Sequence, residues 1–511
     1  MTHLLTEEQA REFDQIAMKN FDITGISLMA NAGKAIAKTA REMLANYDQP
    51  SILILTGKGN NGGDGFATAL YLKKWGYELS IYSIPGENEI KGDAKHFFGR
   101  CQNQNISISF SEAFPALEKP DLIIDALLGT GISLPLREEI FPIIEWINQS
   151  GSLILSVDIP SGLDGNLGKI APVAVLASKT ITMRYPKLGM KFGLGKTLCG
   201  DIISADIGFP PLKDINLAGR QWRQFDESLA FELLKPPKMD TYKHKQGKVL
   251  VLAGSKGMTG AAILSTMSAL RSGAGLTKTF VPESLNLIYE KQILEGMTIP
   301  LKDEGKGYFT LAHLEEIKSH LAWTDVLILG PGLGDKKETI ALVQGLMLKC
   351  NKPMVIDADG LRIFHGKMDL FTDVKSPMII TPHLGELAKI LGREKEEVEE
   401  NILQSLDTLM EQFSGTAVIK TVPACTIYQN QSVLNISGNP SLATAGTGDV
   451  LTGIIGSFIA QGIEIDLAVQ LAVFIHGKTA DALSKTKGYR ALLASDLLEE
   501  IPQTIKYYEK V

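Results

Sequence analysis

Residues 445–453 read AGTGDVLTG, a glycine-rich turn that opens a helix. The apolar residues after the turn recur at helical spacing: Leu451, Ile454, Ile455, Phe458 and Ile459. The free amides of a helix's first turn, together with the positive end of the helix dipole, attract anions. Asp449 lies in this first turn, where it can take a proton from a hydroxyl group while the amides hold a phosphate. The alternative is that Asp449 simply caps the helix, which aspartate does well.

Short apolar runs alternate with glycine-rich turns through the whole second half of the chain. The runs at 248–253, 326–329, 354–356, 378–380 and 417–419 lead to turns at 254–262, 330–334, 357–360 and 381–386 and to Lys420. Buried parallel strands have this continuous apolar character, so the alternation predicts a doubly wound α/β sheet. His383 and Glu386 belong to one of these turns. A lone histidine is more often structural, but its place at a strand end favours a role in a site.

The first half contains the sequence TGKGNNGGDGF at 56–66, which follows an apolar run and precedes a helical pattern. The GxGxxG spacing within it would, by itself, indicate a dinucleotide-binding turn. However, no acidic residue ends the next expected strand, and the turn adds Asn60, Asn61 and Asp64. Amide and carboxylate oxygens beside glycine backbone suit a cation or a polar ligand. A plain tight turn, the structural alternative, does not need these side chains.

Two further strand ends in the first half carry acids among glycines. Asp125 opens DALLGTG at 125–131, and Asp158 follows the apolar run at 152–157. Ligands of open α/β sheets bind beyond the carboxyl ends of the strands. One acid at such a position is often a structural cap, but three strand ends of this kind favour a ligand site.

With 511 residues, of which 44% are hydrophobic and 21% are charged, the chain is expected to form more than one globular domain. We place the domains at 1–218 and 225–511, around a proline-containing connection. The net charge of -7 gives no general attraction to nucleic acid or to anionic membranes. The 4 cysteines are scattered without a CxxC pair, which argues against a zinc site and a disulfide scaffold and fits a reducing cytoplasm.

Neither the start of the chain nor its longest apolar stretch indicates a membrane. Residues 1–15 are too highly charged for a signal peptide, and the stretch at 450–475 is interrupted by polar residues. We therefore expect a cytoplasmic protein that binds neither membranes nor nucleic acid. Glycine-containing apolar helices in the second half lead us to expect a homo-oligomer.

The motifs NNGGDG at 60–65, DALLGTG at 125–131 and VDIPSGLDG at 157–165 together resemble the NAD(P)H-hydrate epimerases, over residues 1–215. The resemblance implies a Rossmann-like αβα sandwich and a potassium ion held by Asn61, Asp125 and Ser161. It implies that Asp158 transfers the proton when the carbon that bears the hydroxyl group is inverted. The residues that it implies for substrate binding are Asn60, Asn61, Gly62, Gly63, Asp64, Gly129, Thr130, Gly131, Ile132, Ser133, Leu134 and Pro135.

The motifs at 330–334, 357–360, 381–386 and 445–453 resemble the ADP- or ATP-dependent NAD(P)H-hydrate dehydratases, over residues 225–505. The resemblance implies a ribokinase-like αβα sandwich, with Asp449 as the base, ADP as co-substrate and a magnesium ion. The substrate would contact Ala261, Gly332 and His383, and the nucleotide would contact Lys420, Thr421, Val422, Pro423, Ala424 and Gly448. This family usually has glycines after the lysine, so the bulkier segment found here narrows the access to the phosphates.

Together, the two resemblances predict a bifunctional metabolite-repair enzyme, an isomerase and a lyase. It would interconvert the R and S forms of hydrated NADH and NADPH, and it would dehydrate the S form with ADP to give the reduced cofactor, AMP and phosphate. The alternative is a ribokinase-like small-molecule kinase fused to a non-catalytic binding domain. A stable phosphorylated product would favour the kinase, whereas the intact Asp125 and Asp158 argue against a non-catalytic first domain.

Overall fold

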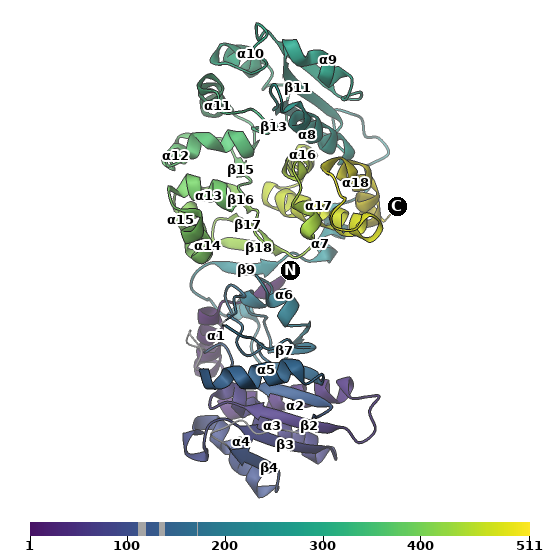
Figure 1. Cartoon of the computed structure of the whole chain (residues 1–511). Helices are drawn as coiled ribbons and strands as arrows, with labels where there is room; N and C mark the ends of the chain where they lie inside the picture. The colour runs from purple at the N-terminus through teal and green to yellow at the C-terminus, as the bar shows by residue number, and fades with distance from the viewer. Residues whose placement is uncertain (111–118, 132–137, 171, 511) are drawn as a thin grey trace. The chain divides into compact units, whose positions relative to one another are not determined.

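The computed structural model describes residues 1–110, 119–131, 138–170 and 172–510, which form two compact units. His3–Trp222 form the smaller unit, and Met1–Thr2 with Arg223–Val511 form the larger one (Figure 1). Four residues that the resemblance implies for substrate binding lie outside the described residues: Ile132, Ser133, Leu134 and Pro135.

The smaller unit is built on a parallel sheet with the strand order β4-β3-β2-β5-β6-β7-β8. Its strands are β2 (Ser51–Thr56), β3 (Glu78–Ser83), β4 (Ser107–Phe110), β5 (Leu122–Ala126), β6 (Leu153–Val157), β7 (Lys179–Met183) and β8 (Asp201–Ala205). The direction in which strands are added to the sheet reverses between β2 and β5, because β3 and β4 extend the sheet on one side and β5 to β8 on the other. The carboxyl ends of β2 and β5 therefore form the crevice in which open α/β sheets bind ligands.

Helices cover both faces of this sheet: α1 (Glu7–Asn20), α2 (Gly25–Met43), α3 (Asn60–Lys74), α4 (Gly92–Asn103), α5 (Phe141–Gln149) and α6 (Gly195–Leu198). Side chains alternate across a strand, so Ile52 and Ile54 pack in the core with α2 and α3, whereas Leu53 and Leu55 pack with α5. Helix α1 begins with a capping box, in which Thr6 and Gln9 satisfy each other's backbone amides. Helix α2 begins at Gly25, where the Thr24 side chain caps it.

The larger unit contains a sheet with the order β18-β17-β16-β15-β14-β13-β10-β11-β12. Neighbouring strands from β16 to β12 are parallel, which confirms the predicted α/β fold, while β17 is antiparallel to both of its neighbours, β16 and β18. The strands are β10 (Lys248–Leu252), β11 (Leu276–Pro282), β12 (Met297–Leu301), β13 (Val326–Leu329), β14 (Met354–Ile356), β15 (Met378–Ile380), β16 (Thr416–Ile419), β17 (Ala424–Tyr428) and β18 (Gln431–Asn435). The hairpin of β17 and β18 was not predicted, because its turn residues Gln429 and Asn430 include no glycine.

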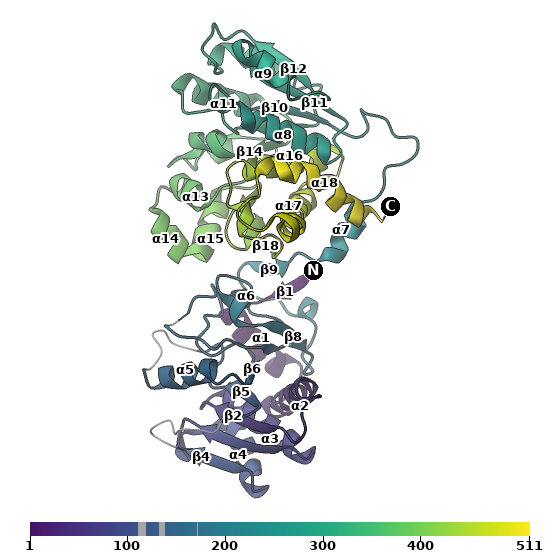
Figure 2. The ribbon, with the colours of Figure 1, turned by 45° about the vertical axis from the view of Figure 1, so that its right-hand side comes forward.

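The helices of this unit are α7 (Glu227–Leu233), α8 (Thr259–Arg271), α9 (Asn286–Glu290), α10 (Leu314–Ser319), α11 (Lys337–Lys349), α12 (Leu370–Asp373), α13 (Leu384–Leu391), α14 (Lys395–Glu400), α15 (Ile402–Gln412), α16 (Thr447–Ala460), α17 (Ile465–Lys487) and α18 (Ala494–Glu509). Helices α8 and α16 lie side by side in both views (Figures 1 and 2). A Cβ atom at Gly453 would lie 1.8 Å from the Ser268 hydroxyl oxygen, so this glycine permits the close approach of α16 to α8. The short strands β1 (Thr2–Leu4) and β9 (Gln221–Gln224) complete the set.

The apolar helices that suggested a homo-oligomer are already covered within the larger unit. Nearly every residue of α16 after Asp449 is buried, and α17 is buried along most of its length. The homo-oligomer therefore stays a prediction without support from these helices. Within the described part of the chain, no helix is both long enough and apolar enough to cross a membrane.

Candidate active sites

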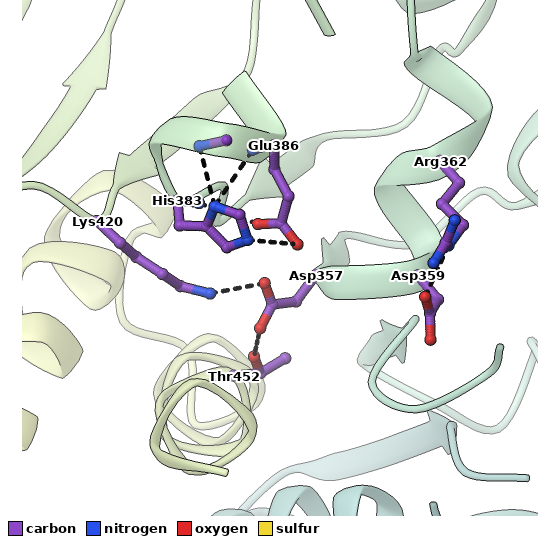
Figure 3. Close-up of polar contacts among 8 residues, drawn as sticks. Asp357, Asp359, Arg362, His383, Glu386, Lys420 and Thr452 are labelled. Atoms are coloured by element: carbon purple, nitrogen blue, oxygen red, sulfur yellow. Dashed lines mark hydrogen bonds and ion pairs between the residues drawn. The ribbon is translucent and has the colours of Figure 1, made fainter. Parts of the chain in front are cut away.

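The strand ends of the larger unit bring together a buried ion pair (Figure 3). Asp357 follows β14 and Lys420 follows β16, and the Lys420 Nζ donates to the Asp357 Oδ1 at 2.7 Å. The Thr452 hydroxyl, from α16, donates to the Asp357 Oδ2 at 3.0 Å. Burial acts to raise the pKa of Asp357, but the charge of Lys420 and these hydrogen bonds lower it below its ordinary value. Asp357 is thus an ionised carboxylate that holds Lys420 in place.

Asp449 lies in the first turn of α16, next to this ion pair. A Cβ atom at the preceding Gly448 would lie 3.2 Å from the Lys420 Nζ and 3.5 Å from the Asp357 Oδ2. The N-cap of α16 is Gly446, and no side chain caps the helix, so the interpretation of Asp449 as a cap is wrong.

The Asp449 carboxylate is free to act as a base. Among the residues that the structure describes, none donates a hydrogen bond to it or pairs with it. Burial raises its pKa to about 7; the negative charges of Asp357 and Asp359 act in the same direction, and Lys420 opposes them. A carboxylate whose pKa lies near neutrality is well suited to accept a proton from a hydroxyl group.

His383 combines a structural position with access to the site. Its Nδ1 accepts hydrogen bonds from the amides of Gly385 and Glu386 at 3.0 and 3.2 Å, so it caps α13. Its Nε2 faces the Glu386 carboxylate at 3.6 Å, and the side chain is 60% exposed. Residue 383 also pairs with Lys420 in an isolated parallel bridge, which brings the two together. His383 therefore has a structural role as the cap of α13, and its contact with substrate stays a prediction.

The remaining residues predicted for this site lie in two places. A Cβ atom at Gly332 would lie 2.8 Å from the Cβ of Ala261, so these two residues are in contact. The segment after Lys420 is a loop that leads to β17, and within it the Thr421 hydroxyl donates to the Pro423 carbonyl at 2.7 Å. Val422 points outward and is 83% exposed. The Thr421 hydroxyl therefore stabilises the loop, and the Val422 side chain faces away from the core.

The smaller unit contains a cavity of about 830 Å³ at the switch point between β2 and β5. Six of the residues predicted for substrate binding line it, namely Asn60, Asn61, Asp64, Gly129, Thr130 and Gly131, and Asp158 lines it too. Gly62 and Gly63 do not line it. A Cβ atom at Gly62 would lie 1.9 Å from the Gly57 carbonyl oxygen, and one at Gly63 would lie 2.6 Å from the Met29 side chain. These two glycines permit the tight entry into α3.

Asp158 is held firmly at the cavity wall. Its backbone adopts φ 65, a left-handed conformation that is strained for a residue other than glycine. Its Oδ1 forms an ion pair with Lys187 and also accepts hydrogen bonds from the Thr182 hydroxyl at 3.2 Å and the Met183 amide at 3.3 Å. Lys187 was not predicted from the sequence. The segment 186–195 is expected there to be a loop near the edge of the first domain, and nothing in it distinguishes Lys187 from Lys191.

The residues predicted to hold potassium form a connected set of oxygen atoms. The Ser161 hydroxyl donates to the Asp125 Oδ1 at 2.6 Å, and the Asn61 Nδ2 donates to the Leu128 carbonyl at 2.7 Å. The Leu128 amide in turn donates to the Ser161 hydroxyl at 3.0 Å. The Asn61 Oδ1 is buried and has no partner among the described residues. Buried polar atoms normally have a partner, so the unpaired oxygen and the buried Asp125 carboxylate fit a monovalent cation.

Comparison with known proteins places the two units in two matched families. Residues 25–189 match the family model described as YjeF-related protein N-terminus, and residues 249–503 match the one described as NAD(P)H-hydrate dehydratase. The chain is 31% identical over 519 residues to a bifunctional NAD(P)H-hydrate repair enzyme of Moorella thermoacetica, covering 99% of this chain and 97% of the relative. It is 32% identical over 505 residues to one of Coxiella burnetii, covering 98% of this chain and 99% of the relative.

Among solved structures, a ribokinase-like superfamily protein from Enterococcus faecalis is similar to this chain with a TM-score of 0.50 at 24% identity. The match covers 57% of this chain and 97% of that chain. At this level of identity the similarity concerns the fold, which is ribokinase-like.

Proposed function

This chain belongs to the family of bifunctional NAD(P)H-hydrate repair enzymes, and from that premise we propose which of its two units catalyses each reaction. The protein is an isomerase and a lyase. It interconverts the R and S forms of hydrated NADH and NADPH, and it dehydrates the S form at the expense of ADP to give NADH or NADPH, AMP and phosphate. We assign the epimerisation to residues 1–218 and the dehydration to residues 225–511.

The dehydration begins with the transfer of a phosphoryl group to the hydroxyl group of the S hydrate. Asp449 accepts the hydroxyl proton, the hydroxyl oxygen forms a bond to the terminal phosphorus of ADP, and AMP leaves. The amides of the first turn of α16 and the Lys420 ammonium offset the negative charge on the phosphoryl group. The free, half-buried carboxylate of Asp449 next to the Lys420–Asp357 ion pair is the observation that carries this proposal.

The phosphate is then expelled, because phosphate is a far better leaving group than hydroxide. The lone pair of the neighbouring ring nitrogen pushes it out, and the adjacent carbon loses a proton to restore the ring double bond. We propose that Ala261, Gly332 and His383 contact the hydrate. Lys420, Thr421, Val422, Pro423, Ala424 and Gly448 are proposed to contact the nucleotide.

A magnesium ion fits this site as a companion of the nucleotide. Within the described ranges, no three or more His, Cys, Asp or Glu side chains are grouped to hold a metal ion. Mg²⁺ usually keeps several waters and binds through substrate phosphates and one or two carboxylates. When bound there, magnesium would neutralise charge on the phosphates, and Asp449 is a carboxylate whose oxygens could help to hold it.

The epimerisation is proposed for the cavity of the smaller unit. Asp158 transfers the proton of the substrate hydroxyl group, and Lys187 keeps this carboxylate oriented. Asn61, Asp125 and Ser161 are proposed to hold a potassium ion, which would supply a fixed positive charge at the cavity wall. Asn60, Asn61, Asp64 and the segment 129–135 are proposed to contact the hydrate, whereas Gly62 and Gly63 do not line the cavity and are proposed only to shape the turn. A cytoplasmic location and a homo-oligomeric state remain part of the proposal.

The dehydration is tested by mixing hydrated NADH with the protein and ADP and following the absorbance of the reduced nicotinamide. The proposal predicts that this absorbance returns and that AMP appears with it. If the absorbance does not return when either ADP or ATP is supplied, the assignment of the larger unit is wrong. A stable phosphorylated product would instead favour a small-molecule kinase. An Asp158→Asn protein that epimerises at the wild-type rate would favour a non-catalytic smaller unit.

A further inference from the structure

Helix α1 supplies one wall of the cavity in the smaller unit, although it lies outside the motifs of that unit. Ala10, Arg11, Phe13, Asp14 and Met18 line the cavity. These positions lie on one face of a helix, since residues three and four apart are neighbours on its surface. Among these residues, Asp14 is the only acid that faces the cavity.

The start of α1 is fixed to the loop that follows Asp158. The Glu7 Oε1 accepts a hydrogen bond from the Gly165 amide at 2.8 Å, and the Glu7 amide donates to the Asn166 Oδ1 at 2.9 Å. Two turns further along, the Phe13 ring packs edge-on against Tyr185, with ring centroids 5.4 Å apart. These contacts hold Asp14 in a defined position relative to the Asp158 loop.

Several elements contribute titratable groups to the lining of this cavity, and the acids among them include Glu89, Asp93 and Glu139. Four further groups bear on proton transfer there. Asp14 comes from α1, Asp64 from α3, Asp158 from the end of β6, and Lys187 from the segment after β7. Lys187 is bound to Asp158 and to the Thr182 hydroxyl at 3.1 Å. Among the described residues, no cation pairs with the carboxyl group of Asp14 or Asp64, and Arg11 pairs with Glu8 instead.

The surroundings of Asp14 favour its neutral form up to mildly acidic pH. Burial raises the pKa of Asp14 to about 6; Lys187 lowers it and the negative charge of Asp158 raises it. The carboxyl group nevertheless remains accessible from the open cavity. Asp64 is more enclosed, and burial raises its pKa well above the ordinary value. Of the two, Asp14 is therefore the one that can exchange a proton with solvent between turnovers.

The chemistry of epimerisation requires an acid as well as a base. The carbon to be inverted bears a hydroxyl group and is bonded to the ring nitrogen. When a base takes the hydroxyl proton, the oxygen electron pair forms a carbonyl group and the carbon–nitrogen bond breaks. The ring nitrogen keeps the bond electrons and must receive a proton. After rotation about the adjacent carbon–carbon bond, the reverse steps close the ring on the other face, and no oxidant or other reactant is needed.

We propose that Asp14 is the general acid of this reaction, which donates a proton to the ring nitrogen while Asp158 accepts the proton of the hydroxyl group. This inference rests on the epimerase function proposed for the smaller unit. On ring closure the two carboxyl groups exchange roles: Asp14 takes the proton back from the nitrogen and Asp158 returns its proton to the oxygen. Each proton transfer is thus balanced within the cavity.

The test follows the conversion of the purified R hydrate to the S hydrate by full-length protein without nucleotide. Wild-type protein establishes that the epimerase is active, which separates a failure of the proposed function from a failure of this inference. The variants are Asp14→Asn and Asp14→Glu. Asp22→Asn is the matched control, because Asp22 lies just beyond α1, is exposed and does not line the cavity. Circular dichroism and thermal unfolding of each variant show that the smaller unit is folded, and dehydration of the S hydrate with ADP shows the same for the larger unit.

We expect Asp14→Asn to lower kcat for epimerisation by roughly 100-fold or more, the typical contribution of one proton-transfer group. KM should change by less than about threefold, because the lost interaction belongs to the transition state. In the wild type the rate should fall as the pH rises through the pKa of Asp14, and this descending limb should be absent from Asp14→Asn and retained in Asp14→Glu. The inference is overturned if Asp14→Asn keeps a wild-type kcat, or if it changes KM alone.

Discussion

The ammonium group of Lys420 lies 2.7 Å from the Oδ1 of Asp357, in an ion pair whose carboxylate is 2% exposed. The pair joins the ends of two parallel strands, and Thr452 ties it to α16. Since Gly448 lies against the pair, the ammonium group faces the turn where we place the phosphates. The same contact that stabilises the fold therefore positions a charge for the reaction.

Removing Lys420 should leave the buried carboxylate of Asp357 without a positive partner. We expect Lys420→Met to destabilise the larger unit by about 3 kcal/mol, because a buried charge that loses its partner is strongly unfavourable. The matched control is Lys318→Met: its ion pair with Glu315 is exposed, and such pairs contribute about 1 kcal/mol or less. Urea unfolding of each variant measures the difference.

The double variant Lys420→Met with Asp357→Asn completes the test. It should be more stable than Lys420→Met alone, because it removes the unpaired charge and keeps a similar shape. If Lys420→Met unfolds like Lys318→Met, the ion pair does not have the energetic role described here.

The free carboxylate of Asp449 predicts the pH dependence of the dehydration. Its ionised form is the base and its pKa is raised to about 7, so the rate should rise with pH through neutrality and then level off. Asp449→Asn should lower kcat by roughly 100-fold or more while nucleotide still binds. The rate profile and a nucleotide titration measure these effects, and a variant that retains its activity would contradict the assignment.

Asp449 also predicts an effect on stability with a defined sign. Its folded-state pKa is raised above the ordinary value, so its favourable contribution is complete at low pH and is lost as the pH rises through about 7. At pH 8, roughly one pH unit above that pKa, the buried carboxylate of the wild type is ionised, so Asp449→Asn should have the higher Tm. In acid the variant should lose this advantage. Thermal unfolding at both pH values checks the sign.

Much of the fold and part of each site could be predicted from the sequence. Buried parallel strands have a distinctive apolar pattern. Glycine turns mark Asp449 and Asp158, and the apolar run at 417–419 marks Lys420, which follows it directly. Asp14 and Lys187 could not be found in this way, because neither belongs to a glycine turn. They reach the cavity through tertiary packing, of α1 in one case and of the segment after β7 in the other. Local patterns do not record such long-range placement.

The close contact between α16 and α8 predicts a strong difference between two glycines. Gly453→Ala should destabilise the larger unit by about 1–3 kcal/mol, because its Cβ would lie 1.8 Å from the Ser268 hydroxyl oxygen and 2.3 Å from the Ser265 carbonyl oxygen. Gly260→Ala in α8 is the control, since nothing lies within 4 Å of its Cβ position. Alanine favours helix more than glycine does, so this control should be neutral or slightly stabilising. Equal unfolding midpoints for the two variants would contradict the packing.

The unpaired oxygen of Asn61 predicts that potassium stabilises the smaller unit. At roughly 100 times its Kd, an ion that binds only the folded state adds about 2.7 kcal/mol of stability. We therefore expect a higher Tm in potassium chloride than in tetramethylammonium chloride of the same ionic strength, because the larger cation cannot enter a buried site. Asn61→Ala should abolish this difference. The neighbouring Asn60→Ala should keep it, because Asn60 is exposed and does not belong to the set of connected oxygens. A potassium effect that survives in Asn61→Ala would place the ion elsewhere.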